Sequence, residues 1–550
     1  LRKNVNENTS IWEPLKVPTF RVIWLSVILS NLGTMIQTVG AGWLMASISN
    51  SDQLVALVQA SNAMPMMVLS LISGALADSY DRRRIVLWAQ SFMLAVAVVL
   101  TVLTASGAIT PWLLLALTFL IGCGVAIHLP SWQASLSDIV PRDQIKKAVT
   151  LNSMGFNLTR SVGPAAGGLL VAVAGPAAAF AVNAFSYIPM ILSISAWKYR
   201  PAPSSLPREG LWSAIRSGVS YIAMSPHQLT IMARGFLFSV CAISVLALLP
   251  LVARDVLNGT SVTFGILLGS YGTGAICGGL FSPLLRARFS NEAVARYSTV
   301  AFGLSALVVG LSHHTWLTIL VILPAGASWL LILSMLNMSI QLLTPRWVMG
   351  RALSLYQTAN FGGMAAGSVI WGWVAAVSEP QIAILCSAGF LGLNLLFGLR
   401  FPFQIFDKSD LDPLNAFIEP ELAMPLSHRS GPIAVTVEYE IAEKNVPEFL
   451  AIMAERRRIR IRDGARRWAL SHDLEHPECW VESYKVATWV EYMRHHSRRT
   501  RKDAGSAQSL RALNRNHAAP KVRRMIEHHH VPLHGDLTVR GMTDADWVQF

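Results

Sequence analysis

Gly74-Ala75-Leu76-Ala77, followed by the basic run Arg82-Arg83-Arg84, has a counterpart 204 residues further along the chain (278 − 74 = 204). There the sequence reads Gly278-Gly279-Leu280-Phe281, followed by Arg286 and Arg288. A duplicated hydrophobic bundle is how many secondary transporters are built, with the substrate path between the halves. The repeat therefore makes transport the leading hypothesis. Other positions return at the same offset: Pro141-Arg142 as Pro345-Arg346, and Gly122, Gly163 and Gly168 as Gly326, Gly367 and Gly372.

The composition is that of a membrane protein. Of the 550 residues, 53% are hydrophobic and only 14% are charged, and the mean hydropathy is +0.44. A soluble protein of this length needs more charge to cover its surface. The polar segment 1–18 predicts no cleavable secretory signal. The five cysteines lack ligand spacing, so we expect no structural disulfide and no zinc site.

Apolar runs of about 20 residues, the length that crosses the hydrocarbon core, predict twelve transmembrane helices. The fold class is therefore an all-α polytopic membrane protein with two six-helix repeats and a C-terminal soluble α+β domain. The expected spans are 20–45, 54–77, 85–106, 112–129, 148–173, 178–197, 229–253, 262–284, 293–312, 316–342, 352–376 and 381–400.

The connections alternate in charge. Those expected outside contain one basic residue, Arg254, whereas the others hold most of the Lys and Arg of this part of the chain. Because Lys and Arg are retained on the cytoplasmic side, both termini are predicted to be cytoplasmic. The predicted parts are a first half (1–200), a cytoplasmic linker (201–228), a second half (229–400), a second linker (401–431), a soluble domain (432–530) and a tail (531–550).

Two segments outside the spans have patterns of their own. Residues 211–224 place Trp212, Ile215, Val219 and Ile222 at helical spacing, which predicts an amphipathic helix on the membrane surface. The alternative is an early extension of the seventh span. Residues 432–530 read as strand, helix, two strands, helix and closing strand, the element order of a ferredoxin-like fold.

The loop after the second span carries a recognisable signature. Gly74 to Arg84 resembles the G-x-L-a-D-x-x-G-R-[RK] loop of the major facilitator superfamily, with Ser79 and Asp81 departing from the pattern. The glycine allows close helix packing. The resemblance implies a cytoplasmic gate or latch in which Asp78 pairs with Arg82. The predicted latch residues are Gly74, Asp78, Arg82, Arg83 and Arg84.

A second motif lies in the fifth span. Gly163-Pro164-Ala165-Ala166-Gly167-Gly168 matches the core of the G-P-x-x-G-G signature of exporters of this superfamily, so Gly163, Pro164, Gly167 and Gly168 are the expected exporter motif. A proline kinks the helix and small residues let it pack closely on a partner. A third signature, an Arg four residues before Gly122, is replaced by Thr118, which puts the usual proton mechanism in doubt.

The substrate path is predicted from polar residues inside the spans. Amides can line a path for an organic solute, a cavity Arg would suit an anionic group, and a His can titrate near neutral pH. Each of them could also bind another helix or the membrane interface. The candidates are Asn31, Gln37, Gln59, Asn62, His128, Arg234, Asn337, Gln341 and Asn360.

The soluble domain resembles the small ferredoxin-like monooxygenase domains of antibiotic biosynthesis. That resemblance implies dimerisation and a pocket between sheet and helices, but no catalytic constellation accompanies it. Trp468, Trp480 and Trp489 are expected in the core or a dimer interface. We interpret His528-His529-His530 as part of a flexible tail rather than a metal site. Basic runs such as Arg456-Arg457-Arg458 favour membrane-surface contacts over nucleic acid.

Taken as a whole, the chain resembles the enterobactin-exporter-like branch of the major facilitator superfamily, also described as transmembrane secretion effectors. The resemblance implies a multi-pass protein of the bacterial cytoplasmic membrane that exports a siderophore, drug or related metabolite by alternating access. The lipid bilayer, a small-molecule substrate and a coupling proton are the expected partners. No cofactor, metal or enzymatic activity is expected. The alternatives are a ligand-sensing membrane protein or a membrane-tethered monooxygenase-like enzyme.

Overall fold

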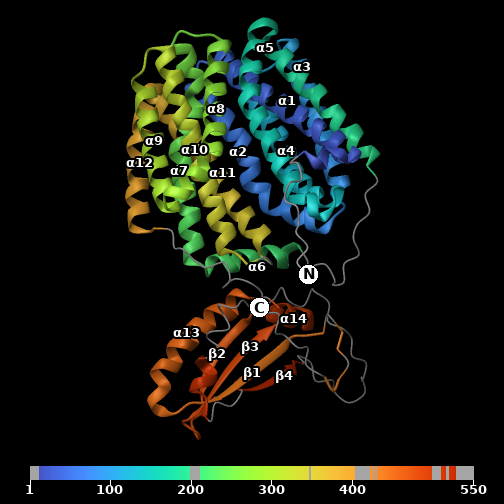
Figure 1. Ribbon diagram of the computed structural model, residues 1–550, viewed down its shortest axis with the longest axis vertical. Helices are drawn as coiled ribbons and strands as arrows, with labels where there is room; N and C mark the ends of the chain where they lie inside the picture. Colours follow the sequence, from blue (N-terminus) through green and yellow to red (C-terminus); the bar gives the residue numbers. More distant parts are fainter. Residues whose placement is uncertain are drawn as a thin grey trace, which may run out of the picture. The chain divides into compact units, whose positions relative to one another are not determined.

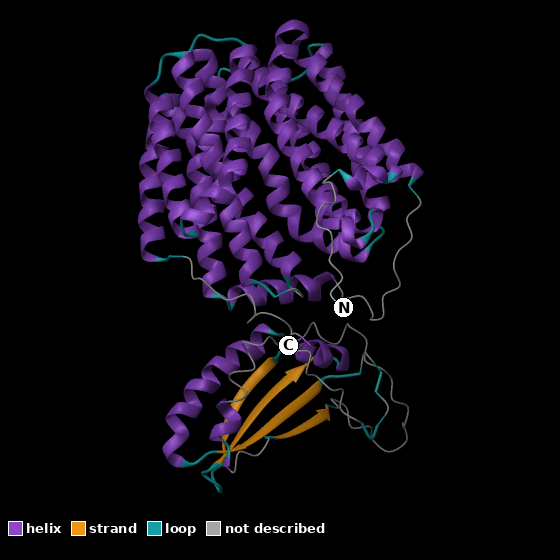
Figure 2. Ribbon diagram, viewed as in Figure 1, coloured by secondary structure: helices purple, strands orange, loops and turns teal. Residues whose placement is uncertain are grey.

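The computed structural model describes residues 12–197, 211–345, 348–402, 422–424, 426–427, 430–497, 509–515 and 520–527. It divides into two compact units, and each is considered by itself. The first contains the long helices and the second contains the β-sheet (Figures 1 and 2).

The helical unit is built from two successive groups of helices. The first group, blue to teal in Figure 1, contains α1 (Pro18–Ile48), α2 (Asp52–Ser79), α3 (Arg82–Ala105), α4 (Pro111–Ile139) and α5 (Ile145–Ala196). The second, green to orange, contains α7 (Pro226–Leu251), α8 (Ser261–Arg288), α9 (Asn291–Leu311), α10 (Thr315–Leu343), α11 (Met349–Val377) and α12 (Pro380–Arg400). Between the groups, α6 (Leu211–Ala223) lies where the sequence predicts an amphipathic helix.

Every predicted span falls on one of these helices, and within the described part of the chain ten helices are long and apolar enough to cross a membrane. Two features separate this number from the predicted twelve. Helix α5 has 52 residues and is interrupted at Gly175, where φ is +79° and ψ is 170°. Glycine adopts this conformation without the steric penalty of a Cβ atom. Helix α11 has 29 residues but is not among the ten, because polar residues and glycines dilute its apolar character.

The surface of the long helices is apolar over much of its area. Large side chains such as Trp88, Val173 and Leu280 are more than two-thirds exposed. Monomeric soluble proteins rarely expose contiguous apolar surface on this scale. Such a surface suits a hydrocarbon environment, in which the helices satisfy their own backbone hydrogen bonds.

Local capping explains several helix boundaries. Asp81 precedes α3, and its side chain accepts hydrogen bonds from the backbone N–H groups of Arg83 and Arg84. Thr260 and Thr263 form a capping box at the start of α8. These side chains satisfy backbone donors that have no partner within the first helical turn.

The second unit contains an antiparallel sheet with the strand order β2-β3-β1-β4. Its elements are β1 (Ile433–Glu440), α13 (Val446–Arg462), β2 (Arg466–His472), β3 (Cys479–Val486), α14 (Trp489–Ser497) and β4 (Lys521–Ile526). The elements therefore follow the β-α-β-β-α-β order that the sequence predicts. Register is regular from Ile433↔Val486 to Glu440↔Cys479, whereas β2 has an irregularity between Arg466 and Ala469.

One face of this sheet packs against both helices. Alternate residues of β1 (Ile433, Val435, Val437 and Tyr439) are buried with Phe449 and Met453 of α13 and with Trp489 and Tyr492 of α14. Burial of every second residue is what the period of two along a strand requires when one face is covered. The predicted Trp489 is thus a core residue, while Trp468 and Trp480 are partly buried beside the core.

Candidate transport pathway and gates

The loop between α2 and α3 fixes several basic side chains. Arg82 donates to the carboxylate of Asp138 on α4 at 2.8 Å and to the Ala134 carbonyl at 3.0 Å. Arg83 donates to the carbonyls of Ile194 and Ser195 at the end of α5. Two of the three predicted latch arginines therefore fasten α3 to neighbouring helices of the same half.

Of the other predicted latch residues, the structure places Gly74 but does not describe the side chain of Asp78. A Cβ atom on Gly74 would lie 3.0 Å from Ser354 Oγ, so this glycine lies beside α11 of the other half. The side chain of Asp78 is outside the described part of the structure. Its pairing with Arg82 therefore stays a prediction.

The exporter motif lies where α5 passes between α1 and α8. Cβ atoms on Gly163 and Gly167 would approach Met35 and Ile36 of α1. On the other side, a Cβ atom on Gly168 would lie 2.7 Å from the Gly265 Cα atom and 2.7 Å from the Ser261 carbonyl of α8. Distances below 3.0 Å leave no room for a side chain, so glycine lets the two backbones meet.

The α5–α8 crossing continues further along both helices. A Cβ atom on Gly272 would lie 2.5 Å from the Arg160 carbonyl, and Ser161 Oγ lies 2.9 Å from Thr273 Oγ1. Small residues allow helices to approach closely in membranes, where no hydrophobic force drives them together. This crossing is a close backbone contact between the first and second halves.

Helices α2 and α11 form a second contact between the halves. Ser70 Oγ lies 2.7 Å from Thr358 Oγ1 and donates to the Ser354 carbonyl at 3.3 Å. Towards the other end, a Cβ atom on Gly372 would lie 2.6 Å from Ala56 Cβ. The sequence repeat identified Gly372 as a scaffold position, but it did not reveal the hydroxyl pair.

A third contact joins the end of α1 to α7 and α8. The Trp43 and Phe264 rings stack with centroids 6.5 Å apart, and Arg254 donates to the Ala46 carbonyl. Arg254 also pairs with Asp255 at 2.6 Å. Both residues lie in a π-helical turn, Val252–Val256, that follows α7. Such turns commonly occur at functional positions in helices.

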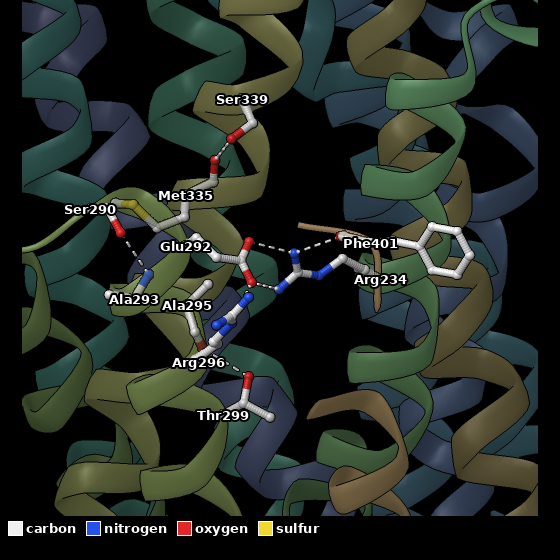
Figure 3. Close-up of polar contacts among 10 residues, drawn as sticks. All are labelled: Arg234, Ser290, Glu292, Ala293, Ala295, Arg296, Thr299, Met335, Ser339 and Phe401. Carbon is white, nitrogen blue, oxygen red and sulfur yellow. Dashed lines mark hydrogen bonds and ion pairs between the residues drawn. The ribbon is translucent and has the colours of Figure 1, made fainter. Parts of the chain in front are cut away.

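Arg234, a predicted substrate residue, lies in an ion-pair cluster (Figure 3). Its guanidinium donates to both carboxylate oxygens of Glu292 at 2.8 and 3.2 Å, and Arg296 Nε donates to the same carboxylate at 2.8 Å. The side chains of Arg234 and Glu292 are only 8% and 14% exposed. The cluster connects α7 to α9, and the Phe401 carbonyl after α12 lies 3.5 Å from Arg234.

This ion pair bears on the predicted role of Arg234 in binding an anionic substrate group. A two-point arginine–carboxylate pair satisfies the charge that an anionic substrate group would otherwise meet. Glu292 lies in the first turn of α9, at the end of a span, and is not among the residues that the sequence predicts for the pathway. The sequence feature that could have predicted this cluster is the spacing of four residues between Glu292 and Arg296, which supports an ion pair on a helix.

Several predicted amides bind neighbouring helices. Asn183 of α5 donates to Gln37 and to the Tyr187 hydroxyl, and both amide residues are buried. Ser239 of α7 donates to Asn360 of α11 at 2.5 Å. Gln37 and Asn360 thus hold helix pairs together, the alternative role that interhelical amides can take.

The remaining candidates are spread along four helices. Asn62 donates to the Val58 carbonyl within α2, and Gln341 donates to Asn337 within α10. His128 of α4 lies 3.5 Å from Gln90 of α3. Asn31 and Gln59 are half-buried on α1 and α2.

The β-sheet unit contains a buried polar cluster that the sequence analysis missed. Glu482 of β3 is fully buried and accepts hydrogen bonds from Tyr439, Arg456, Arg460 and Trp468 at 2.9–3.1 Å. Arg460 also contacts His495 at 2.9 Å. Burial alone would raise the pKa of the Glu482 carboxyl, but the charges and hydrogen bonds of Arg460 and Arg456 lower it to about 2. The signal in the sequence is an acidic residue on the same face of β3 as the buried Tyr484 and Val486, because residues two apart along a strand share a face.

The cluster is internally satisfied, since four donors surround one carboxylate. Among the described residues, no group of three or more His, Cys, Asp or Glu side chains is placed to hold a metal ion. The His528-His529-His530 segment lies outside the described residues.

The fold of the long helices is similar to that of solved transporter structures. A solved structure of an auto-inhibited POT family peptide transporter matches with a TM-score of 0.59 at 14% identity, covering 71% of this chain and 98% of that one. The nucleoside transporter NupG matches with a TM-score of 0.57 at 12% identity, covering 70% of this chain and all of that one. These likenesses concern the fold alone.

The chain belongs to the transmembrane secretion effector family, whose model matches residues 9–531. The enterobactin exporter EntS of Shigella boydii serotype 4 is 26% identical over 393 residues, covering 70% of this chain and 92% of the exporter. The staphyloferrin A transporter of Staphylococcus aureus is 26% identical over 281 residues, covering 50% of this chain and 70% of that protein. Macrolide efflux protein A of Streptococcus pyogenes is 22% identical over 312 residues, covering 55% of this chain and 75% of that protein.

These findings confirm the family resemblance and make the chain a multi-pass bacterial inner-membrane transporter of small molecules. The family and its structural neighbours are transporters, which supports a protein that is not an enzyme. The prediction that the chain acts as a transporter is therefore confirmed at the level of its class.

Proposed function

We propose that this protein exports a small organic molecule, a siderophore or a drug, across the cytoplasmic membrane by alternating access. The observation that carries the proposal is the crossing of α5 on α8, where the exporter motif faces the other half through Gly168 and Gly265. A flat contact between backbones allows two rigid halves to rock without disrupting a side-chain core. The names of the relatives, which include siderophore and macrolide exporters, support the direction of transport.

The proposal includes twelve membrane spans, with α5 counted as two helices divided at Gly175 and with α11 included. Both termini are cytoplasmic, in agreement with the distribution of Lys and Arg. The contact of α1 with α7 and α8 then closes the outer side, and Ser70 with Thr358 closes the inner side. Gly74, Asp78 and the neighbouring arginines remain the proposed inner latch.

The substrate path runs between the halves near the membrane midplane. Asn31 and Gln59 are the strongest of the predicted contacts, because they are half-buried and, among the described residues, have no pair across helices of the kind that Gln37 and Asn360 make. A proton is the proposed coupling ion, by analogy with the superfamily. Among the predicted path residues, His128 lies beside Gln90 within the first half.

The unit at 432–530 is proposed to be a cytoplasmic ferredoxin-like domain that dimerises and regulates transport. Its strand order and its element order support this assignment. Deletion of the chain after Arg400 tests its role: transport that persists without the domain is consistent with a regulatory part rather than with a part of the pathway.

The test of export is reconstitution of the purified full chain in proteoliposomes, with a panel of siderophores and macrolides inside. Release of at least one compound that depends on the protein supports the proposal, and dependence on an imposed pH gradient supports proton coupling. Failure of every compound to leave, with protein that is folded and correctly inserted, contradicts export. Release without any effect of the gradient contradicts only the coupling ion.

A further inference from the structure

Arg286, in the last turn of α8, is a cation without a carboxylate partner among the described residues. Its Nη1 atom contacts the Met338 sulfur of α10 at 3.1 Å, and its Nε atom is buried without a hydrogen-bond acceptor in this part of the structure. A thioether is a weak acceptor, so this contact does not neutralise the charge. Burial of a charged group is costly unless the group is paired.

The internal repeat shows what Arg286 lacks. At the offset of 204 residues, Arg286 corresponds to Arg82 (286 − 204 = 82) and Met338 to Ala134 (338 − 204 = 134). Arg82 contacts the Ala134 carbonyl and pairs with Asp138 at 2.8 Å. The position corresponding to Asp138 is Leu342 (342 − 204 = 138). The second half therefore conserves the arginine and its contact on the neighbouring helix but replaces the counter-ion with a leucine.

The surroundings of Arg286 indicate where a counter-ion would come from. Leu280, Phe281 and Leu284 of α8 are 71%, 57% and 63% exposed and mark the lipid-facing side of the helix, whereas Arg286 follows the buried Ser282 by one turn on the side that contacts α10. Tyr297 is exposed and its ring meets that of Phe289 edge to face at 5.7 Å. Aromatic side chains of this kind concentrate at the headgroup level of a bilayer. Arg286 thus lies at the height at which lipid phosphates occur.

We infer that Arg286 binds the phosphate of an anionic phospholipid, which takes the place that the Asp138 carboxylate has beside Arg82. Arginine matches phosphate oxygens with paired N–H donors, and this interaction is stronger than a hydrogen bond between neutral groups. Anionic lipid would then complete the α8–α10 contact of the second half, whereas the first half completes its own contact with a side chain. The inference requires only a membrane location and does not depend on what the protein transports.

The experiment measures the thermal unfolding midpoint of the purified full chain in nanodiscs of phosphatidylcholine, with and without phosphatidylglycerol. Phosphatidylglycerol should raise the midpoint of the wild-type chain. Arg286→Gln should lose about half or more of that rise, because one phosphate contact is removed while other basic residues still attract the lipid. Arg288→Gln, a change of a neighbouring exposed arginine on the same helix, serves as the matched control and should retain most of the rise.

A second variant supplies the missing partner within the chain. Leu342 is one helical turn beyond Met338 on α10, so Leu342→Asp places a carboxylate on the side of the helix that faces Arg286. This variant should be as stable without phosphatidylglycerol as the wild type is with it, and the lipid should add less. Equal lipid-dependent rises for the wild type, Arg286→Gln and Leu342→Asp would overturn the inference. The same stabilisation by inorganic phosphate in phosphatidylcholine nanodiscs would overturn the assignment to lipid.

Discussion

Glu292 is expected to contribute strongly to the stability of the helical unit. It is the carboxylate that neutralises Arg234, which is almost fully buried. Removal of one partner from a buried ion pair leaves an uncompensated charge, which costs about 3–5 kcal/mol. We expect Glu292→Gln to lower the thermal unfolding midpoint of the detergent-purified protein clearly.

Arg296→Gln is the matched control for this substitution. Arg296 binds the same carboxylate but is 32% exposed, so its loss leaves the pair of Arg234 and Glu292 in place. Its effect should be much smaller than that of Glu292→Gln. Equal effects of the two substitutions would show that the buried pair does not stabilise the contact between α7 and α9.

Glu482 makes the stability of the β-sheet unit depend on pH. Because its folded-state pKa is lowered from 4.5 to about 2, the stabilising effect of the carboxylate is present above pH 4.5 and is lost as the pH falls towards 2. The stability difference between the wild type and Glu482→Gln, on the order of 3 kcal/mol above pH 5, should therefore shrink between pH 4.5 and 2. Thermal unfolding of both proteins across this range measures the difference, and a constant difference would contradict the assignment.

At the scale of residues, sequence patterns identify polar side chains but not their partners. Arg234, Gln37 and Asn360 are all recognisable as polar groups within apolar segments, yet their partners Glu292, Asn183 and Ser239 are 58, 146 and 121 residues away. Contacts of this range depend on how the helices pack, which a single sequence does not encode locally. Asp81 is a second polar residue whose partners the pattern does not reveal. It departs from the family signature, and it is the N-cap of α3.

The α5–α8 crossing is the element on which the proposed movement depends. An alanine at Gly168 would place its Cβ atom 2.7 Å from backbone atoms of α8, and backbone cannot move aside as a flexible side chain can. We expect Gly168→Ala to separate the helices and to reduce export by about tenfold, corresponding to about 1.4 kcal/mol on the rate-limiting barrier. Gly392→Ala on α12 is the control, since its Cβ atom would meet nothing within 4 Å. Equal export by both variants would exclude a role for close contact at Gly168.

Helix positions were easier to predict than helix contacts. Long apolar runs place every predicted span on a helix, because length and hydropathy are properties of the segment itself, although α4 continues ten residues beyond the predicted end at 129 (139 − 129 = 10). Two predicted spans are joined in α5, with a break at Gly175. The boundary between them depends on the backbone conformation of this single residue. The hydroxyl pair Ser70–Thr358 has no signature in either segment, since Ser and Thr are common within membrane helices.

The proposed orientation of the whole molecule is argued from the distribution of charge and can be tested directly. Pro380 is the first residue of α12, and Ser430 precedes β1 of the sheet unit. A single cysteine introduced at position 380 should react with a membrane-impermeant reagent added to intact cells, whereas one at position 430 should react only after the cells are opened. The native cysteines must first be replaced, because Cys277 and Cys386 are exposed. The reverse labelling pattern would invert the topology.

The repeat predicts the plan of the molecule better than it predicts its mechanism. Positions that return in both halves, such as Gly168 and Gly372, lie at contacts between the halves. Other corresponding positions differ in chemistry between the halves: Asp138 corresponds to Leu342, and Pro164 corresponds to Ser368. The repeat returns positions at which helices cross, whereas the charges at corresponding positions differ between the two halves.

Export by relative movement of the two halves is tested most directly by a reversible lock between α2 and α11. Ser70 Oγ and Thr358 Oγ1 lie 2.7 Å apart, so Ser70→Cys with Thr358→Cys should form a disulfide in a background without the native cysteines. In proteoliposomes loaded with an exported compound, the oxidised double variant should release none, and a reductant should restore release to the level of the single variants. Release at the wild-type rate by fully cross-linked protein would contradict alternating access.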